Sequence, residues 1–451
     1  MRASIRSPRS RLLPALAALV LPGLLAAQRP AAAPARLADD LRFLAADALE
    51  GRLTGSPGAD SAAAYLARRF AEVGLQPTPE GWYQDFEVSP RAAVAQHAGL
   101  AGKRGRNVIG ILPGHDPVRR HETVVLGAHY DHLGRGGFGA LDPDSAGRVH
   151  NGADDNASGT AALIHVASQL AKSPPARTVV FVAFDGEELG LLGSAAYVKQ
   201  PPFPLSRVLA MVNLDMVGRL RSDRLIAMGT GTAKEFTPLL DSLNWYAAFD
   251  LRKQPDGWGR SDQSSFLAAK RPVLFLFTDL HEDYHRATDD VERLNLDGLK
   301  RVVDFTASLT TALADRRTPL TFIDVPQPKP TVATTAGPHG PADPHGTRSP
   351  GGGPIRATSG YGAYLGTIPD MADAPEGGGV RLSGVRAGSP AERAGLRADD
   401  VITRIGTHAV ADLQAMTDAL RSHAAGDEVE ITIVRGGATR TVRATLGTRG
   451  G

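Results

Sequence analysis

The sequence predicts an α/β protein with a mostly parallel mixed sheet flanked by helices, followed by a smaller, β-rich domain. Short apolar, strand-like runs alternate with helical segments between residues 123 and 278. A Pro/Gly-rich stretch then separates this region from a second group of strand-like segments beyond residue 356. Strands this apolar, when they alternate with helices, form largely parallel sheets that are covered on both faces.

Composition limits the classes of protein that the chain can represent. A length of 451 residues exceeds what one hydrophobic core usually serves, so two domains are expected. The net charge of +2 gives no reason to expect nucleic acid or an anionic membrane as a partner. The chain has no cysteine, which excludes disulfides, thiolate zinc sites and a cysteine nucleophile. Any zinc would therefore be bound by nitrogen and oxygen ligands.

The N-terminus has the pattern of a secretory signal. Several arginines precede an apolar run from Leu12 to Ala27, which is interrupted by Pro14 and Pro22. The run is too short and too interrupted for a good membrane span, so a retained anchor is the disfavoured alternative. We predict a signal peptide over residues 1–27, a mobile mature N-terminus over 28–36, and an exported protein that is periplasmic or extracellular, with no stable membrane span after cleavage.

The elements of the larger domain can be predicted in order from periodicity and from Gly or Pro boundaries. Amphipathic helices are expected from Leu37 to Ala48 and from Ala62 to Val73, the second ending at Gly74. Two strands are expected at 82–88 and 106–112. The alternating part that follows comprises strands at 123–128, 178–184, 208–214 and 273–278, with helices at 158–171 and 189–199.

Five residues of the metal-ligand type occur in order, each in a short motif, and several follow directly after a predicted strand. Open α/β sheets place their ligand sites at the carboxyl ends of strands, so these residues are expected to converge. Two imidazoles and three carboxylates suffice for two zinc ions that share one bridging carboxylate. The five are His129, Asp155, Glu188, Asp215 and His285.

Their neighbours suggest further roles and leave alternatives open. Glu187 can stay free as a general base beside Glu188, and Asp131 can accept a hydrogen bond from the His129 ring. Each residue also has an ordinary interpretation, such as helix capping by the acidic pair before Asn156. The ordered occurrence of all five argues against that. Two rival ligands remain: His132, expected to point elsewhere if His129 is bound, and His281, which could face the same way as His285 on a helix.

Residues from about Leu37 to Asp315 resemble the co-catalytic two-zinc exopeptidase family, which includes bacterial leucyl aminopeptidases and aminopeptidase Y. The resemblance implies the zinc exopeptidase fold, two Zn²⁺ per chain bound by the five ligands above, and Asp155 as the bridge. It also implies Glu187 as general base, Asp131 as the residue that orients the histidine, Tyr284 as an oxyanion-side hydroxyl and a cis peptide at Asp155–Asn156. One departure is Gln263, where many relatives have His.

The end of the chain contains a linker and a second domain. Residues 326–354 are rich in Pro, Gly, Thr and His, and we predict a flexible linker over 316–355 in which His339 and His345 are solvated. Residues 356–447 resemble a PDZ domain of the kind attached to bacterial secreted proteases. That resemblance implies a loop at 364–367 that binds a peptide carboxylate, beside a strand to which an extended peptide adds. The alternative is a packing module without a free groove.

These features together predict a secreted zinc-dependent exopeptidase, an aminopeptidase that acts on peptide or protein substrates. A single-zinc acyltransferase resembling glutaminyl cyclases is one alternative. The presence of Asp215 and of the motif from Asn156 to Gly159 argues for two ions and against it. A catalytically inactive envelope scaffold that uses the PDZ domain is another, but it predicts a substituted ligand and none is seen.

Overall fold

The computed structural model describes Met1 and residues 32–88, 99–326 and 363–447, with short gaps at 138, 143–144, 146, 260, 370–374, 376–377, 387, 412–414, 417–418 and 421. The predicted signal peptide lies outside the described residues, apart from Met1. Most of the predicted linker lies outside them as well.

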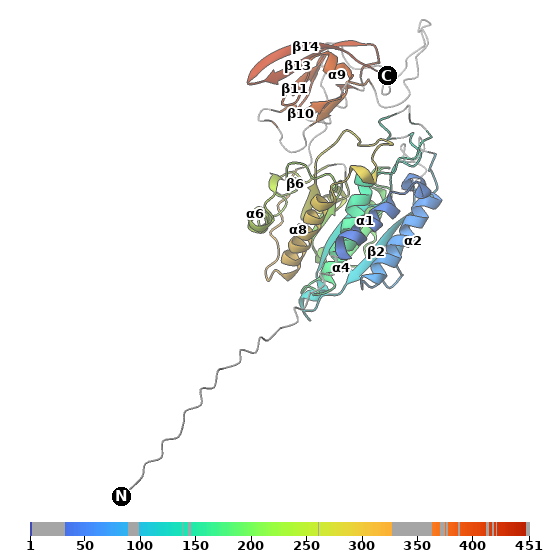
Figure 1. Cartoon of the computed structure of the whole chain (residues 1–451), viewed down its shortest axis with the longest axis vertical. Helices are drawn as coiled ribbons and strands as arrows, with labels where there is room; N and C mark the ends of the chain where they lie inside the picture. Colours follow the sequence, from blue (N-terminus) through green and yellow to red (C-terminus); the bar gives the residue numbers. More distant parts are fainter. Residues whose placement is uncertain are drawn as a thin grey trace, which may run out of the picture.

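The larger domain is built on an eight-stranded mixed sheet with the order β1-β2-β4-β3-β5-β8-β6-β7 (Figure 1). Its centre, β4-β3-β5-β8, is parallel, while β2 and β6 join this centre as antiparallel neighbours. The strands are β1 (Tyr83–Glu87), β2 (Arg104–Leu112), β3 (Thr123–His129), β4 (Thr178–Phe184), β5 (Val208–Leu214), β6 (Arg224–Met228), β7 (Asp250–Gln254) and β8 (Val273–Phe277).

The central strands are mostly apolar because both of their faces are covered. In β3, Val124 and Leu126 belong to the main core on one side of the sheet, whereas Val125 belongs to a second core on the other. The main core lies under α1 (Ala32–Leu44), α2 (Pro57–Glu72), α4 (Gly159–Leu170) and α8 (Leu296–Asp315), which Figure 1 shows on the same side of the sheet. The second core lies near α5 (Leu192–Lys199) and α7 (Gln263–Ala268).

Both ends of this domain extend further than predicted. Helix α1 begins at Ala32, so residues 32–36 are helical rather than a mobile N-terminus. The alanines there favour a helix, and Pro34 is tolerated in a first turn because its missing N–H would have no helical partner. At the other end, Phe322 packs on the second core and Trp258 donates to the carbonyl of Val325. Residues 316–325 are therefore part of this domain and not linker.

The second domain is β-rich, with its own core formed mainly by aliphatic side chains such as Leu382, Ile402 and Ile431. Its strands pair in the order β14-β13-β11-β10-β9, and β12 pairs with β11. Between β12 and β13, Met416 and Ala419 add buried side chains to this core. The strands are β9 (Thr367–Pro369), β10 (Val380–Val385), β11 (Val401–Ile405), β12 (His408–Ala409), β13 (Glu428–Arg435) and β14 (Ala438–Thr445), and the short helix α9 spans Pro390–Arg393.

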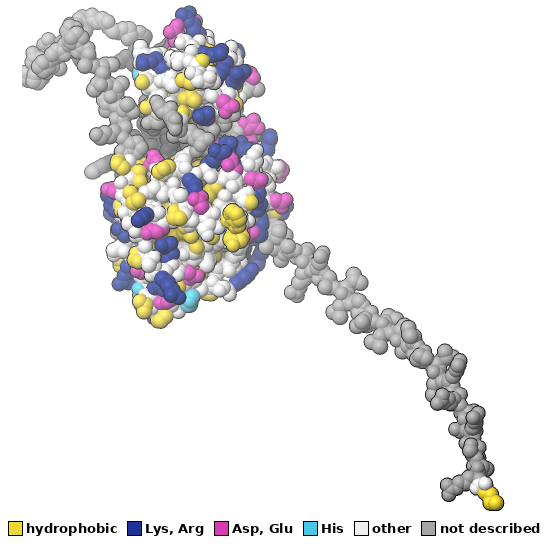
Figure 2. All heavy atoms as spheres, turned by 90° about the vertical axis from the view of Figure 1, so that its left-hand side faces the viewer, with side chains coloured by type: hydrophobic (Ala, Val, Ile, Leu, Met, Phe, Trp, Pro, Cys, Tyr) yellow, Lys and Arg dark blue, Asp and Glu magenta, His cyan; other side chains and the backbone are white. Residues whose placement is uncertain are grey.

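The visible surface carries both signs of charge. Figure 2 shows Lys and Arg side chains interspersed with Asp and Glu, and hydrophobic side chains scattered between them. Among the helices of the described ranges, none combines the length and the apolar character needed to cross a membrane.

Candidate metal centre

The side chains predicted as ligands gather at one edge of the large sheet, where its central parallel strands end. His129 is the last residue of β3, Glu188 lies in the turn after β4, and Asp215 directly follows β5. Asp155 comes from η4 (Ala153–Ser158), the irregular turn that leads into α4, and His285 from the loop after β8. The fold thus brings all five residues to one small volume.

The first group of donors consists of His129, Asp155 and Asp215. Nε2 of His129 lies 3.3 Å from Asp155 Oδ1 and 3.3 Å from Asp215 Oδ1. Ser261 donates from its hydroxyl to the other Asp215 oxygen at 2.8 Å and so fixes the orientation of that carboxylate. All three donors are buried, and their polar atoms therefore face one another rather than bulk water.

The second group shares Asp155 with the first. Nε2 of His285 lies 3.2 Å from Asp155 Oδ2 and 3.1 Å from Glu188 Oε2. Because Asp155 directs Oδ1 to one imidazole and Oδ2 to the other, it stands where a bridging carboxylate would stand. The peptide bond between Asp155 and Asn156 is cis, as the resemblance implied.

The expectation that His132 points away from the site is wrong. Its Nδ1 lies 2.8 Å from Glu188 Oε1, so the Glu188 carboxylate lies between the rings of His132 and His285. The ring packs over Gly152, where a Cβ would come within 2.5 Å of it. The motif His129-Tyr-Asp-His132 contained the signal, but its spacing alone does not show that both imidazoles reach the same carboxylates.

The hydrogen bonds of His129 and His285 show which ring nitrogen faces the carboxylates. Nδ1 of His129 lies 3.2 Å from the carbonyl oxygen of Asp131, and Nδ1 of His285 lies 2.9 Å from that of Gly139. A carbonyl oxygen only accepts, so Nδ1 carries the proton in each ring, and a neutral ring directs the lone pair of Nε2 at carboxylate oxygens. Lone pairs on both sides require a cation between them. Zinc fits this donor set of imidazole nitrogen and carboxylate oxygen.

The electrostatics of the side chains are consistent with a site that holds positive charge. Burial by itself lowers the pKa of His129, but the carboxylates of Asp215 and Glu187 raise it well above its ordinary value. Burial raises the pKa of Asp155, yet its contacts with His129 and His285 bring it well below the usual range. The carboxylates around His129 and His285 therefore favour positive charge at these rings, which a proton or a bound metal cation can supply.

Asp131 pairs with the ring of His129 and also binds the Glu187–Glu188 turn, and its shorter contacts are those to the turn. Its Oδ1 accepts from the Glu187 amide at 3.1 Å, and its Oδ2 from the Glu188 amide at 3.3 Å. The distance of 3.6 Å from Asp131 Oδ1 to His129 Nδ1 is too long for a hydrogen bond, and the main-chain carbonyl of Asp131 contacts that nitrogen instead. The Asp131 carboxylate therefore fixes the turn that carries Glu187 and Glu188.

The Glu187 side chain is close to the donors but separate from them. Its carboxylate makes no hydrogen bond to any residue in the described part of the chain. Burial raises the pKa of Glu187 well above its ordinary value; His129 opposes this shift, and the nearby carboxylate of Glu188 adds to it. A carboxylate of this kind beside a metal site is able to take up a proton.

The remaining predicted or rival residues lie around this centre. The ring of Tyr284 stacks on His285 with the centroids 3.9 Å apart, which places Tyr284 beside the second donor group. His281 lies 3.1 Å from Asp154 Oδ2, and the segment between His281 and His285 is a turn rather than a helix. His281 therefore does not share the direction of His285.

The Gln263 departure lies behind the donors. Its Oε1 accepts from the Asn213 side chain at 3.0 Å, and the same Asn213 amide donates to Ser261 at 2.8 Å. Because Ser261 in turn contacts Asp215, Gln263 belongs to the support of the first group and does not touch it.

The fold and this double cluster define an α/β protein with a histidine- and carboxylate-lined metal site of the zinc peptidase class. Comparison with known protein families specifies it further: residues 107–310 match peptidase family M28, and residues 363–446 match the PDZ domain. The larger domain is therefore similar to peptidase family M28 over residues 107–310, and the second domain is similar to PDZ domains over residues 363–446.

Several known proteins are similar to parts of the chain. A probable leucine aminopeptidase from Arthroderma otae is 29% identical over 211 residues, covering 44% of this chain and 56% of that protein. Aminopeptidase YwaD from Bacillus subtilis is 28% identical over 234 residues, covering 49% and 48%. A probable glutamate carboxypeptidase from Arabidopsis thaliana, LAMP1, is 32% identical over 174 residues, covering 37% and 21%. The chain thus spans between about a fifth and about half of the length of these relatives.

Solved structures support the fold. A zinc aminopeptidase from Bacillus subtilis, BSAP, aligns with a TM-score of 0.50 at 17% identity, covering 65% of this chain and 98% of that one. A Zn-dependent exopeptidase from Parabacteroides distasonis aligns with a TM-score of 0.50 at 20% identity, covering 63% and 97%. At this level of identity the likeness concerns the architecture alone.

Proposed function

We propose that the chain is an exported, zinc-dependent exopeptidase that removes residues from the N-terminus of peptides. The observation that carries this proposal is the pair of donor groups that share Asp155, with the free carboxylate of Glu187 beside them. The N-terminal arginines and apolar run of the sequence support export. Relatives named as aminopeptidases align over about half of their length, against about a fifth for the glutamate carboxypeptidase, which favours amino-terminal trimming.

The residues divide the work of hydrolysis between binding and proton transfer. His129 and Asp215 would hold one zinc ion, Glu188 and His285 a second, and Asp155 both. Bound zinc polarises a water molecule and the substrate carbonyl. Glu187 takes a proton from the attacking water and returns it to the leaving amine. Its raised pKa suits both steps, because a base must hold the proton between them.

Replacement of Glu187 by Gln tests the role of this carboxylate. We expect kcat for aminoacyl p-nitroanilides to fall roughly 10²- to 10⁴-fold, because general base catalysis contributes about that factor. Zinc content should remain at the wild-type level, since Glu187 is outside both donor groups. Glu292→Gln, an exposed carboxylate, is the matched control and should keep full activity. Turnover within a few-fold of wild type in a zinc-loaded Glu187→Gln variant would contradict the role.

Paired substrates test which end of a peptide is trimmed. They are given to the mature chain before and after its metal is removed by a chelator. Peptides blocked at the C-terminus should be hydrolysed and peptides blocked at the N-terminus should resist. The reverse pattern would identify a carboxypeptidase, and zinc without turnover of either set would move the proposal toward the acyltransferase alternative. The PDZ domain is proposed to bind an extended peptide or a peptide C-terminus, which truncation after residue 326 would test by comparing long with short substrates.

A further inference from the structure

Arg52 is a fully buried cation that lies behind the candidate metal centre. Its exposed fraction is 0%, and its backbone is in the left-handed region with φ of 49°. The guanidinium donates to four main-chain carbonyls, at 2.6 Å to Tyr130, 2.7 Å to Asn151 and 3.0 Å to Gly152, with the fourth contact to Leu44 at the end of α1. Arg52 thus binds the segment between His129 and Asp131 and the segment before Asp155 at the same time.

The main chain around Arg52 reinforces these contacts. The carbonyl of Gly51 accepts from Gly134 at 3.0 Å, and the carbonyl of Arg52 lies 3.3 Å from the His132 amide. A Cβ on Gly51 would lie only 2.3 Å from the carbonyl oxygen of Gly134, and its φ is 70°, so a glycine is required there. The turn therefore fits closely against the loop that carries His132.

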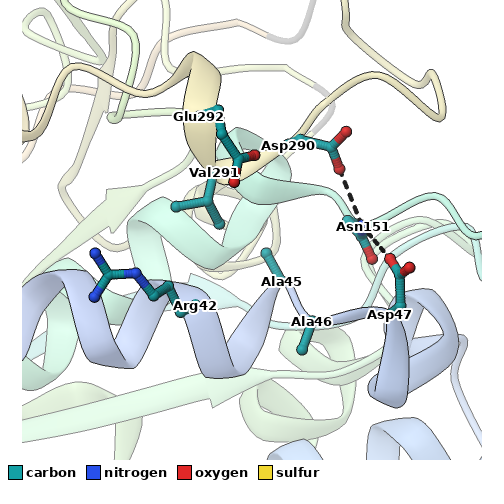
Figure 3. Close-up of a pocket in the computed structure, with 8 residues that line it drawn as sticks. All are labelled: Arg42, Ala45, Ala46, Asp47, Asn151, Asp290, Val291 and Glu292. Atoms are coloured by element: carbon teal, nitrogen blue, oxygen red, sulfur yellow. Dashed lines mark hydrogen bonds between the residues drawn. The ribbon is translucent and has the colours of Figure 1, made fainter.

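Asn151 holds the second of these segments from the outside. Its amide donates to Asp47 at 2.7 Å and to Asp290 at 3.0 Å, as Figure 3 shows. The carbonyl of the same residue accepts from Arg52. The loop that leads to Asp155 is thus fixed by the Asn151 side chain near the surface and by Arg52 inside.

The charge of Arg52 is balanced by the field of the metal centre rather than by a direct partner. Its guanidinium donates only to carbonyl oxygens among the described residues, and a buried cation without compensation is costly. Burial lowers its pKa to about 10, with Asp131, Asp155, Asp289 and Glu188 acting in the opposite direction. Arg52 stays charged at neutral pH, and the surplus of carboxylates around the donors supplies the compensation.

We propose that Arg52 is a positioning residue for metal binding: by clamping the Tyr130 and Asn151–Gly152 segments together, it sets the separation at which Asp155 can serve both donor groups. The inference rests on the proposed zinc site. It predicts that loss of the clamp weakens zinc binding, because supporting contacts of this kind are worth roughly 10- to 100-fold in metal affinity.

The chain provides a matched control in Arg177, another buried arginine. Arg177 is 2% exposed and donates to the carbonyls of Ala314 and Arg316 and to the carboxylate of Glu122. It directly precedes β4, whereas the Glu187–Glu188 turn follows the other end of that strand. Arg177→Lys should therefore cost stability without touching the metal centre. The pair separates a loss of folding from a loss of positioning.

The experiment is a competition between apo-protein and a chromogenic chelator for zinc, with circular dichroism to establish folding. We expect Arg52→Lys to bind zinc about 10- to 100-fold more weakly than wild type at one or both sites. Arg177→Lys should stay within about threefold. Equal zinc affinity in wild type and a folded Arg52→Lys variant would overturn the inference, and so would an equal loss in Arg177→Lys.

Two further results keep the test decisive. If Arg52→Lys does not fold, Asn151→Ala removes only the outer support of the same segment, and unchanged zinc affinity in that variant overturns the inference. We expect the zinc affinity of Asn151→Ala to be about two- to fivefold lower than that of wild type, a smaller loss than the factor expected for Arg52→Lys. A wild-type chain that binds no zinc would overturn the proposed function and this inference together. A wild-type chain that binds zinc no more tightly than a folded Arg52→Lys variant would overturn this inference alone.

Discussion

Replacement of Asp155 should remove both metal ions, whereas replacement of Asp215 should remove one. Asp155 supplies one oxygen to each donor group, 3.3 Å from His129 and 3.2 Å from His285. Asp215 contacts only the first group. In Asp155→Ala each group keeps two of its three donors, and in Asp215→Ala the second group stays complete.

The expected loss of zinc affinity follows from the contribution of one ligand to metal binding. Removal of a residue that merely supports a ligand lowers metal affinity about 10- to 100-fold. Removal of a ligand itself should exceed that, so each zinc site in Asp155→Ala should weaken by more than about 100-fold, or more than about 2.7 kcal/mol. In Asp215→Ala, only the zinc site of the first donor group should weaken by this factor.

The assay is metal analysis after dialysis against micromolar free zinc, combined with anilide hydrolysis. Wild type should retain about two ions per chain, Asp215→Ala about one and Asp155→Ala close to none. Ser389→Ala, in the second domain, serves as a control for handling and should match wild type. Equal zinc content in the Asp155 and Asp215 variants would show that Asp155 does not serve both groups and would refute the assignment.

Three further predictions concern residues outside the two donor groups. Asp40 is buried and paired with Arg69 at 2.7 Å; burial raises its pKa, but hydrogen bonds from His165, Arg69 and Tyr65 bring it down to about 2, below the ordinary 3.8. Its contribution of roughly 2 kcal/mol should be present above pH 4 and be lost as the pH falls through about 2, and urea melts across this range should show the loss in wild type but not in Asp40→Asn. His281→Ala should leave the zinc content unchanged, because His281 contacts Asp154 and neither donor group, and loss of an ion by metal analysis would contradict this. Tyr284→Phe should lower kcat by about 100- to 1000-fold without changing zinc content if its hydroxyl stabilises the oxyanion, and an unchanged kcat in steady-state kinetics would reject that role.

The sequence allowed the central strands to be predicted closely, because their signal is local. The runs at 178–184 and 208–214 are apolar apart from Thr178 and Asn213 and are bounded by charged residues, and they coincide with β4 and β5. Strands β6 and β7 were not predicted. The half-buried edge strand β7, Asp250–Gln254, is polar or charged at four of its five positions, and only its pairing with β6 makes it a strand.

The metal-donor residues of the candidate site could be predicted from the sequence, whereas Arg52, which contacts the segments beside them, could not. His129, Asp155 and Asp215 stand in recognisable motifs, and the sheet brings them together. Arg52 gave no such signal, since a turn of Glu, Gly and Arg is typical of solvent-exposed loops. Its role depends on four carbonyl oxygens from three distant segments, and main-chain acceptors leave no trace in a sequence.

The two amide contacts of Asp131 have a thermodynamic consequence. Because one carboxylate holds the amides of both Glu187 and Glu188, the proton acceptor and a metal donor are mounted on a single ordered turn. The conformational entropy of that turn is therefore lost when the chain folds, and not again when an ion or a substrate arrives. Loosening the turn, as in Asp131→Asn, should make zinc binding and the orientation of Glu187 deteriorate together, so that occupancy of the metal site and catalytic competence cannot be adjusted independently in this protein.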